Sequence, residues 1–324
     1  MRTLYILGNG FDLHHGLDTR YQHFCFFLQD TNKELYESLI TYFGLPDLDR
    51  TNALSFADPQ WKYFEEALSQ LDTDSVMDRY SDYAADIGSP DFSDREWGAY
   101  AREIGWFVDK ITKGLFESFQ TFIRSVTYPE TIESKKIQLV SDSLYLNFNY
   151  TTTLERYYGI TQSSILYLHG KAEDNADLVL GHGVDPSNFV TKEQEPPADY
   201  TDEMYELWRE GMSDQFDYST ELAREELHLY FSDTFKDTDR VIKRYAALFQ
   251  SLTTVDQVVI LGHSLNDIDL PYIEHIAGKV SPDSLWYCSY YGAEEEEEHR
   301  YTLTGIGIPP QKLQLLQLTD LVIF

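Results

Sequence analysis

The chain has 324 residues, of which 42% are apolar and 15% aromatic, and it carries a formal net charge of −30 at pH 7. This length allows one large globular domain or two smaller ones with a substantial core. The excess of acidic residues argues against a nucleic-acid groove or a surface for anionic membranes, because both need clustered Lys and Arg. A nucleotide ligand is not excluded, since backbone amide groups hold phosphate without a basic patch.

Cysteine usage and the lack of an apolar leader indicate a cytoplasmic protein without a bound metal. Cys25 and Cys288 are the only cysteines and lie far apart, which gives neither a disulfide framework nor a C-x-x-C zinc site. His14 and His15 are adjacent, so on a helix they point to different faces and form a poor metal pair. We find no signal peptide and no apolar run near the roughly 18 residues that a membrane helix needs.

The N-terminal stretch contains the strand, glycine turn and helix start that open a dinucleotide-binding unit. Thr3–Leu7 is an uninterrupted run of apolar and β-favouring residues, and Gly8-Asn9-Gly10 follows it directly. Glycines let a backbone approach a phosphate, while free amide groups and a helix dipole favour the anion. Leu13 stands where a G-x-G-x-x-G motif has its third glycine, so a tight turn that binds nothing is the alternative.

Helical periodicity dominates the chain as far as residue 130. Apolar residues at three- and four-residue spacing predict a helix over residues 13–28 and a second over Lys33–Phe43, which Gly44 ends. Residues 94–126 keep a period of about 3.6 residues and predict a single long helix, whose aromatic stripe packs against its neighbours. We interpret residues 57–130 as a helical insertion in the α/β unit.

The remainder of the chain alternates strands with helices. Short apolar runs predict strands at 143–148, 165–168, 178–180, 258–261, Leu285–Tyr290 and Leu313–Gln317. Helices are predicted at 152–158, at Leu270–Ala277, from Ala293 onward, and in a second block over 200–250 that is interrupted near 232–238; residues 185–200 form a loop or lid. This alternation is typical of an α/β fold with a doubly wound, mostly parallel, Rossmann-like sheet.

The residues that directly follow the predicted strands are rich in Gly, Asn, His and Asp. Ligands of open parallel sheets bind outside the carboxyl ends of the strands, so these residues should gather at one edge. They are Gly8 to Asp12, Asn149 to Thr151, His169 and Gly170, Gly181 to Asp185, and Gly262 to Asp267. Stability alone does not require such a set, and we expect a ligand crevice there. Taken singly, Asn149 could be a helix-cap residue and His169 a turn histidine.

Six motifs, in order along nearly the whole chain, resemble the AbiH family, a bacterial group associated with abortive infection against phage. They are GNGFDLHHGL near the start, WKYFE at 61–65, LNFNYTTTLE at 146–155, YLHGK at 167–171, LGHG at 180–183 and GHSLNDID at 262–269. Their order and spacing argue against accidental similarity. The resemblance implies a phage-defence effector.

The same segments resemble, more distantly, the sirtuin-like NAD-binding fold. Sirtuins carry a G-A-G-x-S loop with a later glycine, and the matching positions here are Gly8, Gly10 and Gly16, with Asp12 in place of the serine. The resemblance implies a sirtuin-like nucleotide-binding α/β domain formed by residues 1–56 and 131–324. It also implies NAD as the substrate or ligand.

Further sirtuin motifs match the later strand ends. The T-Q-N-I-D strand end of sirtuins places their ribose-site asparagine at Asn149, and their catalytic H-G falls on His169-Gly170. Their G-T-S-L matches residues 262–265. Thr151 replaces the acid of T-Q-N-I-D and the chain has no zinc module, so the resemblance does not extend to protein deacylation.

What the resemblance implies is an NAD glycohydrolase that cleaves the nicotinamide N-glycosidic bond, a reaction that needs positioning more than nucleophile chemistry. Asn149 would fix the ribose or the attacking water, and His169 would act as the base. The residues expected to bind the nucleotide are Gly8, Asn9, Gly10, Phe11, Asp12, Gly170, His182, Gly262, His263, Ser264 and Asp267.

Two other functions stay open at this point. One is a non-catalytic nucleotide-binding sensor or interaction protein in phage defence, and the other is a nuclease effector, against which the acidic charge counts. A hydrolase triad at Ser264 is not expected, because the closing glycine of a nucleophile elbow is missing. The expected partners are a nucleotide ligand and a second copy of the chain or a phage-derived trigger, with no membrane and no nucleic acid.

Overall fold

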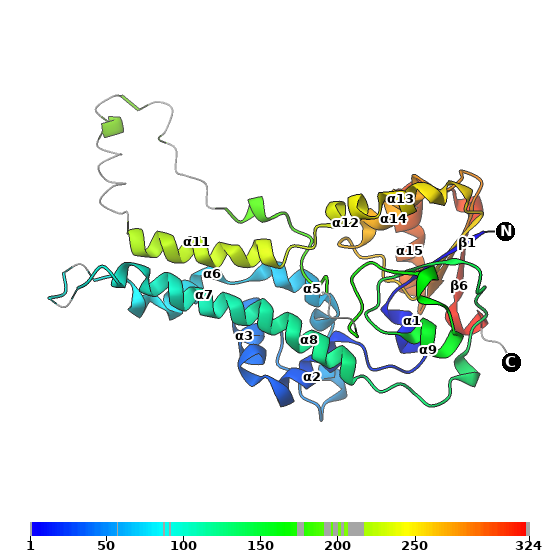
Figure 1. The fold of residues 1–324 in the computed structure, drawn as a ribbon, viewed down its shortest axis with the longest axis horizontal. Helices are drawn as coiled ribbons and strands as arrows, with labels where there is room; N and C mark the ends of the chain where they lie inside the picture. The colour runs from blue at the N-terminus through cyan, green and yellow to red at the C-terminus, as the bar shows by residue number, and fades with distance from the viewer. Residues whose placement is uncertain are drawn as a thin grey trace.

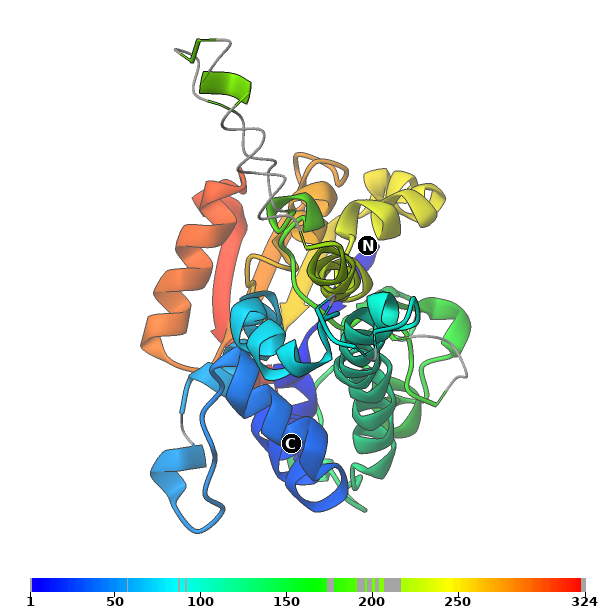
Figure 2. The same cartoon turned by 90° about the vertical axis from the view of Figure 1, so that its left-hand side faces the viewer.

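The computed structural model describes residues 2–56, 58–86, 88–90, 92–173, 178–190, 196, 200–201, 204–206 and 217–321. Figure 1 shows a sheet flanked by helices and, beside it, an elongated group of helices. Turned by 90°, this helical group lies in front of the sheet (Figure 2). Within the described residues, no helix has the length and apolar character needed to cross a membrane.

Within the described ranges, six strands form one sheet in which every neighbouring pair is parallel, in the order β3-β2-β1-β4-β5-β6. The strands are β1 (Thr3–Leu7), β2 (Leu144–Asn147), β3 (Ile165–Tyr167), β4 (Gln257–Leu261), β5 (Leu285–Tyr290) and β6 (Leu313–Gln317). The strand order reverses between β1 and β4, so their carboxyl ends form the topological switch point. The expected doubly wound α/β fold is therefore confirmed, and the sheet is wholly parallel.

Alternate residues of β1 enter two apolar clusters, one on each face of the sheet. Leu4 and Ile6 pack with the helices α12 to α15, and Tyr5 and Leu7 pack with α1 and α9. Burial on both faces explains why β1 is an unbroken apolar run. These helices are α1 (Asn9–His14), α9 (Thr153–Tyr158), α12 (Thr238–Arg244), α13 (Ala246–Gln250), α14 (Leu270–Ala277) and α15 (Ala293–Gly305), and together with the six strands they make the sheet body.

The remaining long helices share a separate, aromatic-rich core that we call the helical body. Within it, Phe24 and Phe119 form an edge-to-face pair with ring centroids 5.2 Å apart. Its helices are α2 (Tyr21–Thr31), α3 (Lys33–Phe43), α5 (Phe64–Ala67), α6 (Thr73–Arg79), α7 (Ala99–Ile111), α8 (Lys113–Ser125) and α11 (Tyr218–Asp233). Because it includes α2 and α3, it begins before residue 57; the division into an insertion at 57–130 stays a prediction.

Shorter elements connect these helices and strands. They are α4 (Ala53–Phe56) and the 3-10 helices η1 (Gln60–Tyr63), η2 (Leu68–Gln70), η3 (Ser81–Tyr83), η4 (Glu96–Gly98), η5 (Glu133–Lys135), η6 (Gln162–Ser164), η7 (Pro186–Asn188), η8 (Ser251–Thr254), η9 (Pro310–Lys312) and η10 (Leu318–Leu321). Element η7 lies in the segment expected to be a loop or lid, part of which falls outside the described residues.

Two of the predicted helices are each divided in the structure. The helix expected over 13–28 is replaced by α1 and α2, because Gly16 adopts a φ of +85° and turns the chain between them. The helix expected over 94–126 is replaced by α7 and α8. Thr112, with φ −109° and ψ −82°, separates them, and its hydroxyl donates to the carbonyl oxygen of Val108 at 2.8 Å. The aromatic stripe is buried, as expected.

The strand expected at 178–180 does not belong to the sheet. Leu178 and Leu180 are buried in the helical body, so side-chain burial rather than strand pairing decides the path of the backbone. In the helical block expected over 200–250, the described helices α11, α12 and α13 are interrupted at 234–237, as predicted. Residues 202–203 and 207–216 of that block lie outside the described residues.

The glycine turns after β1 and β4 pack directly on each other. The amide of Gly10 donates to the carbonyl oxygen of Gly262 at 2.7 Å, and the amide of Gly8 donates to that of Leu261 at 3.0 Å. A Cβ atom on Gly262 would lie 2.1 Å from the amide nitrogen of Phe11, and the φ of Gly262 is +62°. Both the close approach and the left-handed backbone require glycine at this position.

We predict that Gly262→Ala destabilises the fold far more than Gly44→Ala. Gly44 has a φ of +65° with no atom near its missing side chain, so alanine there should cost only about 1 kcal/mol for the left-handed backbone. Alanine at Gly262 adds a collision with backbone atoms, and we expect a loss above about 3 kcal/mol. Denaturant unfolding of both variants measures the difference, and equal losses would contradict the close packing.

Candidate functional site

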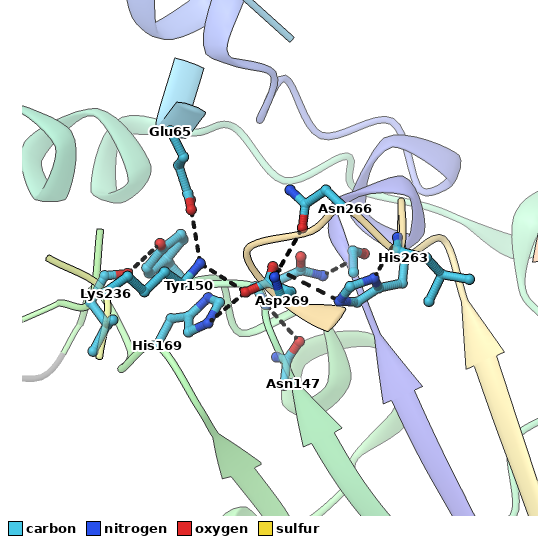
Figure 3. A network of polar contacts seen from close by, with 12 residues as sticks. Glu65, Asn147, Tyr150, His169, Lys236, His263, Asn266 and Asp269 are labelled. Carbon is cyan, nitrogen blue, oxygen red and sulfur yellow. Dashed lines mark hydrogen bonds and ion pairs between the residues drawn. The ribbon is translucent and has the colours of Figure 1, made fainter. Parts of the chain in front are cut away.

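A buried polar network lies at the carboxyl ends of β2, β3 and β4, where the helical body meets the sheet body. Figure 3 shows Glu65 reaching the network from α5, while the strands end beneath it. Its central group is the carboxylate of Asp269, which directly precedes α14. Around that carboxylate lie Lys236, His169 and His263.

The Asp269 carboxylate contacts three basic groups at once. Its Oδ1 atom lies 2.9 Å from the Nζ of Lys236 and 3.4 Å from the Nε2 of His169, and its Oδ2 atom lies 4.0 Å from the Nε2 of His263. The backbone amide of Asp269 donates to the side-chain oxygen of Asn266 at 3.2 Å, which fixes the start of α14. Asp269 therefore joins the turn after β3 to the turn after β4.

Lys236 connects the two bodies of the molecule. Its side chain is fully buried, and its Nζ donates to the Oε2 of Glu65 at 2.8 Å while also contacting Asp269. The Oε1 of Glu65 accepts a hydrogen bond from the hydroxyl of Tyr21 at 2.5 Å. The backbone amide of Lys236 donates to the carbonyl oxygen of His182, which sets its position. Buried charges persist only when they are paired in this way.

The pKa values in the network follow from burial and charge. Burial alone would raise the pKa of Asp269, but Lys236 and His169 beside it hold that pKa well below its ordinary value. Burial alone would lower the pKa of Lys236, and the carboxylates of Asp269 and Glu65 raise it instead. For His263, burial outweighs Asp269 and lowers the pKa to about 4. At neutral pH, Asp269 and Lys236 are therefore charged and His263 is neutral.

Aromatic rings enclose the two histidines. The ring of Phe148 lies 5.1 Å from that of His169 and 4.5 Å from that of His263, and Tyr150 lies 6.0 Å from His169. The hydroxyl of Tyr272 is buried nearby and has no hydrogen-bond partner among the described residues. A water-poor surround strengthens every electrostatic interaction inside it, and unsatisfied buried polar atoms often mark functional sites.

The structure brings Asn149 and the glycine turns together beside this network. The side-chain amide of Asn149 donates to the carbonyl oxygen of Gly8 at 3.0 Å, and a Cβ on Gly8 would lie 2.5 Å from the Cα of His263. The amides of Gly8, Gly10 and Phe11 all donate to carbonyl oxygens within the protein. A phosphate at this turn must therefore displace one of these hydrogen bonds or bind side chains instead.

Asp12, an expected nucleotide-binding residue, is buried and makes its hydrogen bonds outside the network around Asp269. Its two carboxylate oxygens accept hydrogen bonds from the hydroxyls of Thr151 at 2.5 Å and Thr153 at 2.6 Å, which joins α1 to the start of α9. Phe11 is buried in the apolar core between α1 and α9, and Asn9 exchanges hydrogen bonds with Thr19. Burial raises the pKa of Asp12 to about 6, despite the two hydroxyl donors.

The other predicted residues lie outside the network. His182 is fully buried among the rings of Phe189, Phe231 and Phe235, with centroid distances of 5.6, 6.0 and 6.2 Å. Gly170 forms a turn with a φ of +84° directly after His169. The side chains of Ser264 and Asp267 are exposed at the turn after β4.

Glu65, Lys236 and Asp269 are not predicted from the sequence patterns. Asp269 lies in the GHSLNDID motif, where Pro271 in the first turn of α14 marks it as the residue before the helix. Glu65 stands next to the buried Phe64 in the WKYFE motif. No comparable signal precedes Lys236, because its partners come from distant segments.

The side chains of the network are buried, and among the described residues they have no metal-like arrangement. In the described part of the chain, no group of three or more His, Cys, Asp or Glu residues could hold a metal ion. One hollow of about 480 Å³ lies among α6, α7 and α11, and another of about 340 Å³ lies beside α9. Neither is lined by a residue of the network. His169, Lys236 and His263 are buried, so the site is closed in this structure.

A comparison with protein-family models identifies the relatives of the chain. Residues 4–290 match the family model described as "Bacteriophage abortive infection AbiH". The chain belongs to the AbiH family. It is thus a protein of phage abortive infection, as its motifs predicted. In the comparisons with curated proteins and with solved structures, nothing matches, so the sirtuin-like resemblance stays a prediction.

We predict that Asp12→Asn in this AbiH-family protein gains stability relative to the wild type as the pH rises towards 6. The carboxyl has an ordinary pKa of 3.8 and a pKa of about 6 in the folded chain, so the folded state binds its proton more tightly. The stabilisation that this proton provides is complete below pH 3.8, the ordinary pKa. It is lost as the pH rises through about 6, the pKa in the folded chain.

The amide variant has no such titration. We therefore expect the unfolding free energy of Asp12→Asn, measured relative to the wild type, to increase by on the order of 3 kcal/mol between about pH 4 and pH 6.5. Above that range the difference should stay constant. Denaturant unfolding at a series of pH values tests this. Two parallel pH profiles would show that Asp12 titrates normally.

Proposed function

We propose that this AbiH-family protein is an abortive-infection effector that binds NAD or a related nucleotide at the buried network and hydrolyses NAD at the nicotinamide glycosidic bond. One observation carries the proposal: Asn149, His169, His263 and Asp269 converge at the carboxyl edge of the sheet, beside the switch point between β1 and β4. Open α/β sheets bind their ligands at this place.

The proposed chemistry assigns a role to each of these groups. As the glycosidic C–N bond breaks, its electron pair goes to the pyridinium nitrogen, and water adds to the ribose carbon. His169 accepts the proton of that water, or polarises a ribose hydroxyl, while Asp269 at 3.4 Å orients the imidazole and stabilises its protonated form. Asn149 fixes the ribose or the water. The products are nicotinamide and ADP-ribose.

The charges around His169 suit this reaction. Glu65 and Asp269 supply two carboxylates, and Lys236 supplies one ammonium, so the enclosed network has an excess of negative charge. The transition state for cleavage resembles an oxocarbenium ion and is positively charged. In a water-poor site, fixed charges of the opposite sign lower the energy of such a state.

The closed state of the site suits an effector that must stay silent before infection. His169 is 2% exposed and Asn149 is 5% exposed, so a substrate reaches them only when the covering segments move. We propose that the contact between Glu65 of α5 and the sheet edge opens during binding. The trigger would be a phage-derived molecule or assembly with a second copy of the chain.

A second function is favoured by the same burial. Because His169 and Asn149 are buried, a nucleotide binds only when the covering segments move, and that movement by itself would signal to a partner without turnover. In that case NAD or ADP-ribose stabilises the protein and is recovered intact.

We predict that His169→Ala and Asn149→Ala reduce nicotinamide release from NAD without abolishing ligand binding. Loss of a general base typically lowers turnover by about 10² to 10⁴-fold. Nicotinamide release and thermal shift with NAD should be measured for both variants, with His228→Ala in the helical body as the control. Full activity of His169→Ala would remove its assignment as base. A thermal shift with intact NAD for the wild type would favour the sensor.

A further inference from the structure

Lys236 forms an ion pair with one carboxylate from each body of the molecule. Its Nζ lies 2.8 Å from the Oε2 of Glu65, which belongs to α5, and 2.9 Å from the Oδ1 of Asp269, at the sheet edge. Figure 3 shows the ammonium between the two carboxylates, with His169 on the same side of Asp269 as Lys236 and His263 on the opposite side. No described contact joins Lys236 or Glu65 to His169 directly. Any influence of theirs on His169 therefore acts through Asp269 and through the electric field.

The same oxygen of Asp269 serves both Lys236 and His169. Oδ1 lies 2.9 Å from the ammonium and 3.4 Å from the imidazole, so the ammonium and the imidazole compete for one carboxylate oxygen. Glu65 in turn competes with Asp269 for the ammonium. The charge on the α5 side of Lys236 thus determines how much negative charge remains for His169.

We propose that Lys236 and Glu65 are positioning residues, which set the proton affinity of His169 through Asp269. In this arrangement the helical body controls the base at the sheet edge: Glu65 raises the proton affinity of the imidazole, and Lys236 lowers it. This inference rests on the proposed function only for its catalytic consequence. The effect on His169 exists with or without a substrate.

The substitutions at Glu65 and Lys236 should shift the titration midpoint of His169 in opposite directions, which distinguishes this role from a structural one. Glu65→Gln removes one negative charge and Lys236→Met removes one positive charge, while neither change touches an atom in contact with His169. At an effective dielectric constant of about 20, a unit charge several ångströms away shifts a titration by on the order of one pH unit. The double variant has the same net charge as the wild type.

The other titratable groups facing the network are the same in every variant. They are Tyr21 from α2, Glu66 from α5, Tyr150 after β2, His263 after β4, Asp237 before α12, Tyr272 from α14 and His299 from α15. Their contribution cancels when variants are compared with the wild type.

The experiment is an NMR titration of ¹³C-labelled histidine in the ligand-free full chain, with the His169 signal assigned from His169→Gln. We expect the midpoint of His169 to fall by about one pH unit in Glu65→Gln, to rise by about as much in Lys236→Met, and to return towards the wild-type value in the double variant. Glu37→Gln, which removes an exposed carboxylate of α3, should leave the midpoint unchanged.

Shifts of the same sign in the two single variants, or no shift in either, would overturn the proposal. If Lys236→Met does not fold, Glu65→Gln and the double variant decide: the former must lower the midpoint and the latter must restore it. In the pH profile of nicotinamide release, the acid limb of each variant should shift in the same direction as its His169 midpoint. If neither the wild type nor any variant releases nicotinamide but the NMR midpoints shift as expected, the proposed function fails and this inference stands.

Discussion

The ion pairs of the buried Lys236 join the helical body to the sheet body at the candidate site. A fully buried ammonium is stable only with carboxylates in contact, and here one comes from α5 and the other from the start of α14. Separating the two bodies would leave at least one charge unpaired in an apolar surround. Ion pairs as well as apolar packing therefore hold the helical body against the carboxyl edge of the sheet. Because the helical body covers this edge, the site is closed.

The sheet beneath this contact has its own constraint at the switch point. Turns after β1 and β4 approach so closely that Gly10 and Gly262 share a hydrogen bond of 2.7 Å, and Asn149 ties the first turn to the end of β2. In many dinucleotide-binding folds the corresponding amides are open to a ligand. Here they bind other parts of the chain, so the network of side chains becomes the main candidate for recognition.

Much of the fold could be predicted because its strands and several helices carry local signals. The bounds of α3, α14, β5 and β6 follow from apolar runs with clear ends. The break at Thr112 and the burial of Leu178 away from the sheet depend on tertiary packing, which no local pattern reports. A parallel topology makes strand ends meet, so His169 and Asn149 could be proposed as neighbours. Glu65 and Lys236 could not, because their positions depend on how the two bodies meet.

The order of the strands also determines when the network can form during synthesis. β1 is central in the sheet, and its register joins Thr3 to Gln257. The second edge of this N-terminal strand is therefore paired only after most of the chain has been synthesised. Of the charged groups, Glu65 emerges early from the ribosome, whereas Lys236 and Asp269 emerge late. A nascent chain that has not yet reached residue 236 lacks two of the three charges that hold the bodies together, so this contact forms only late in synthesis.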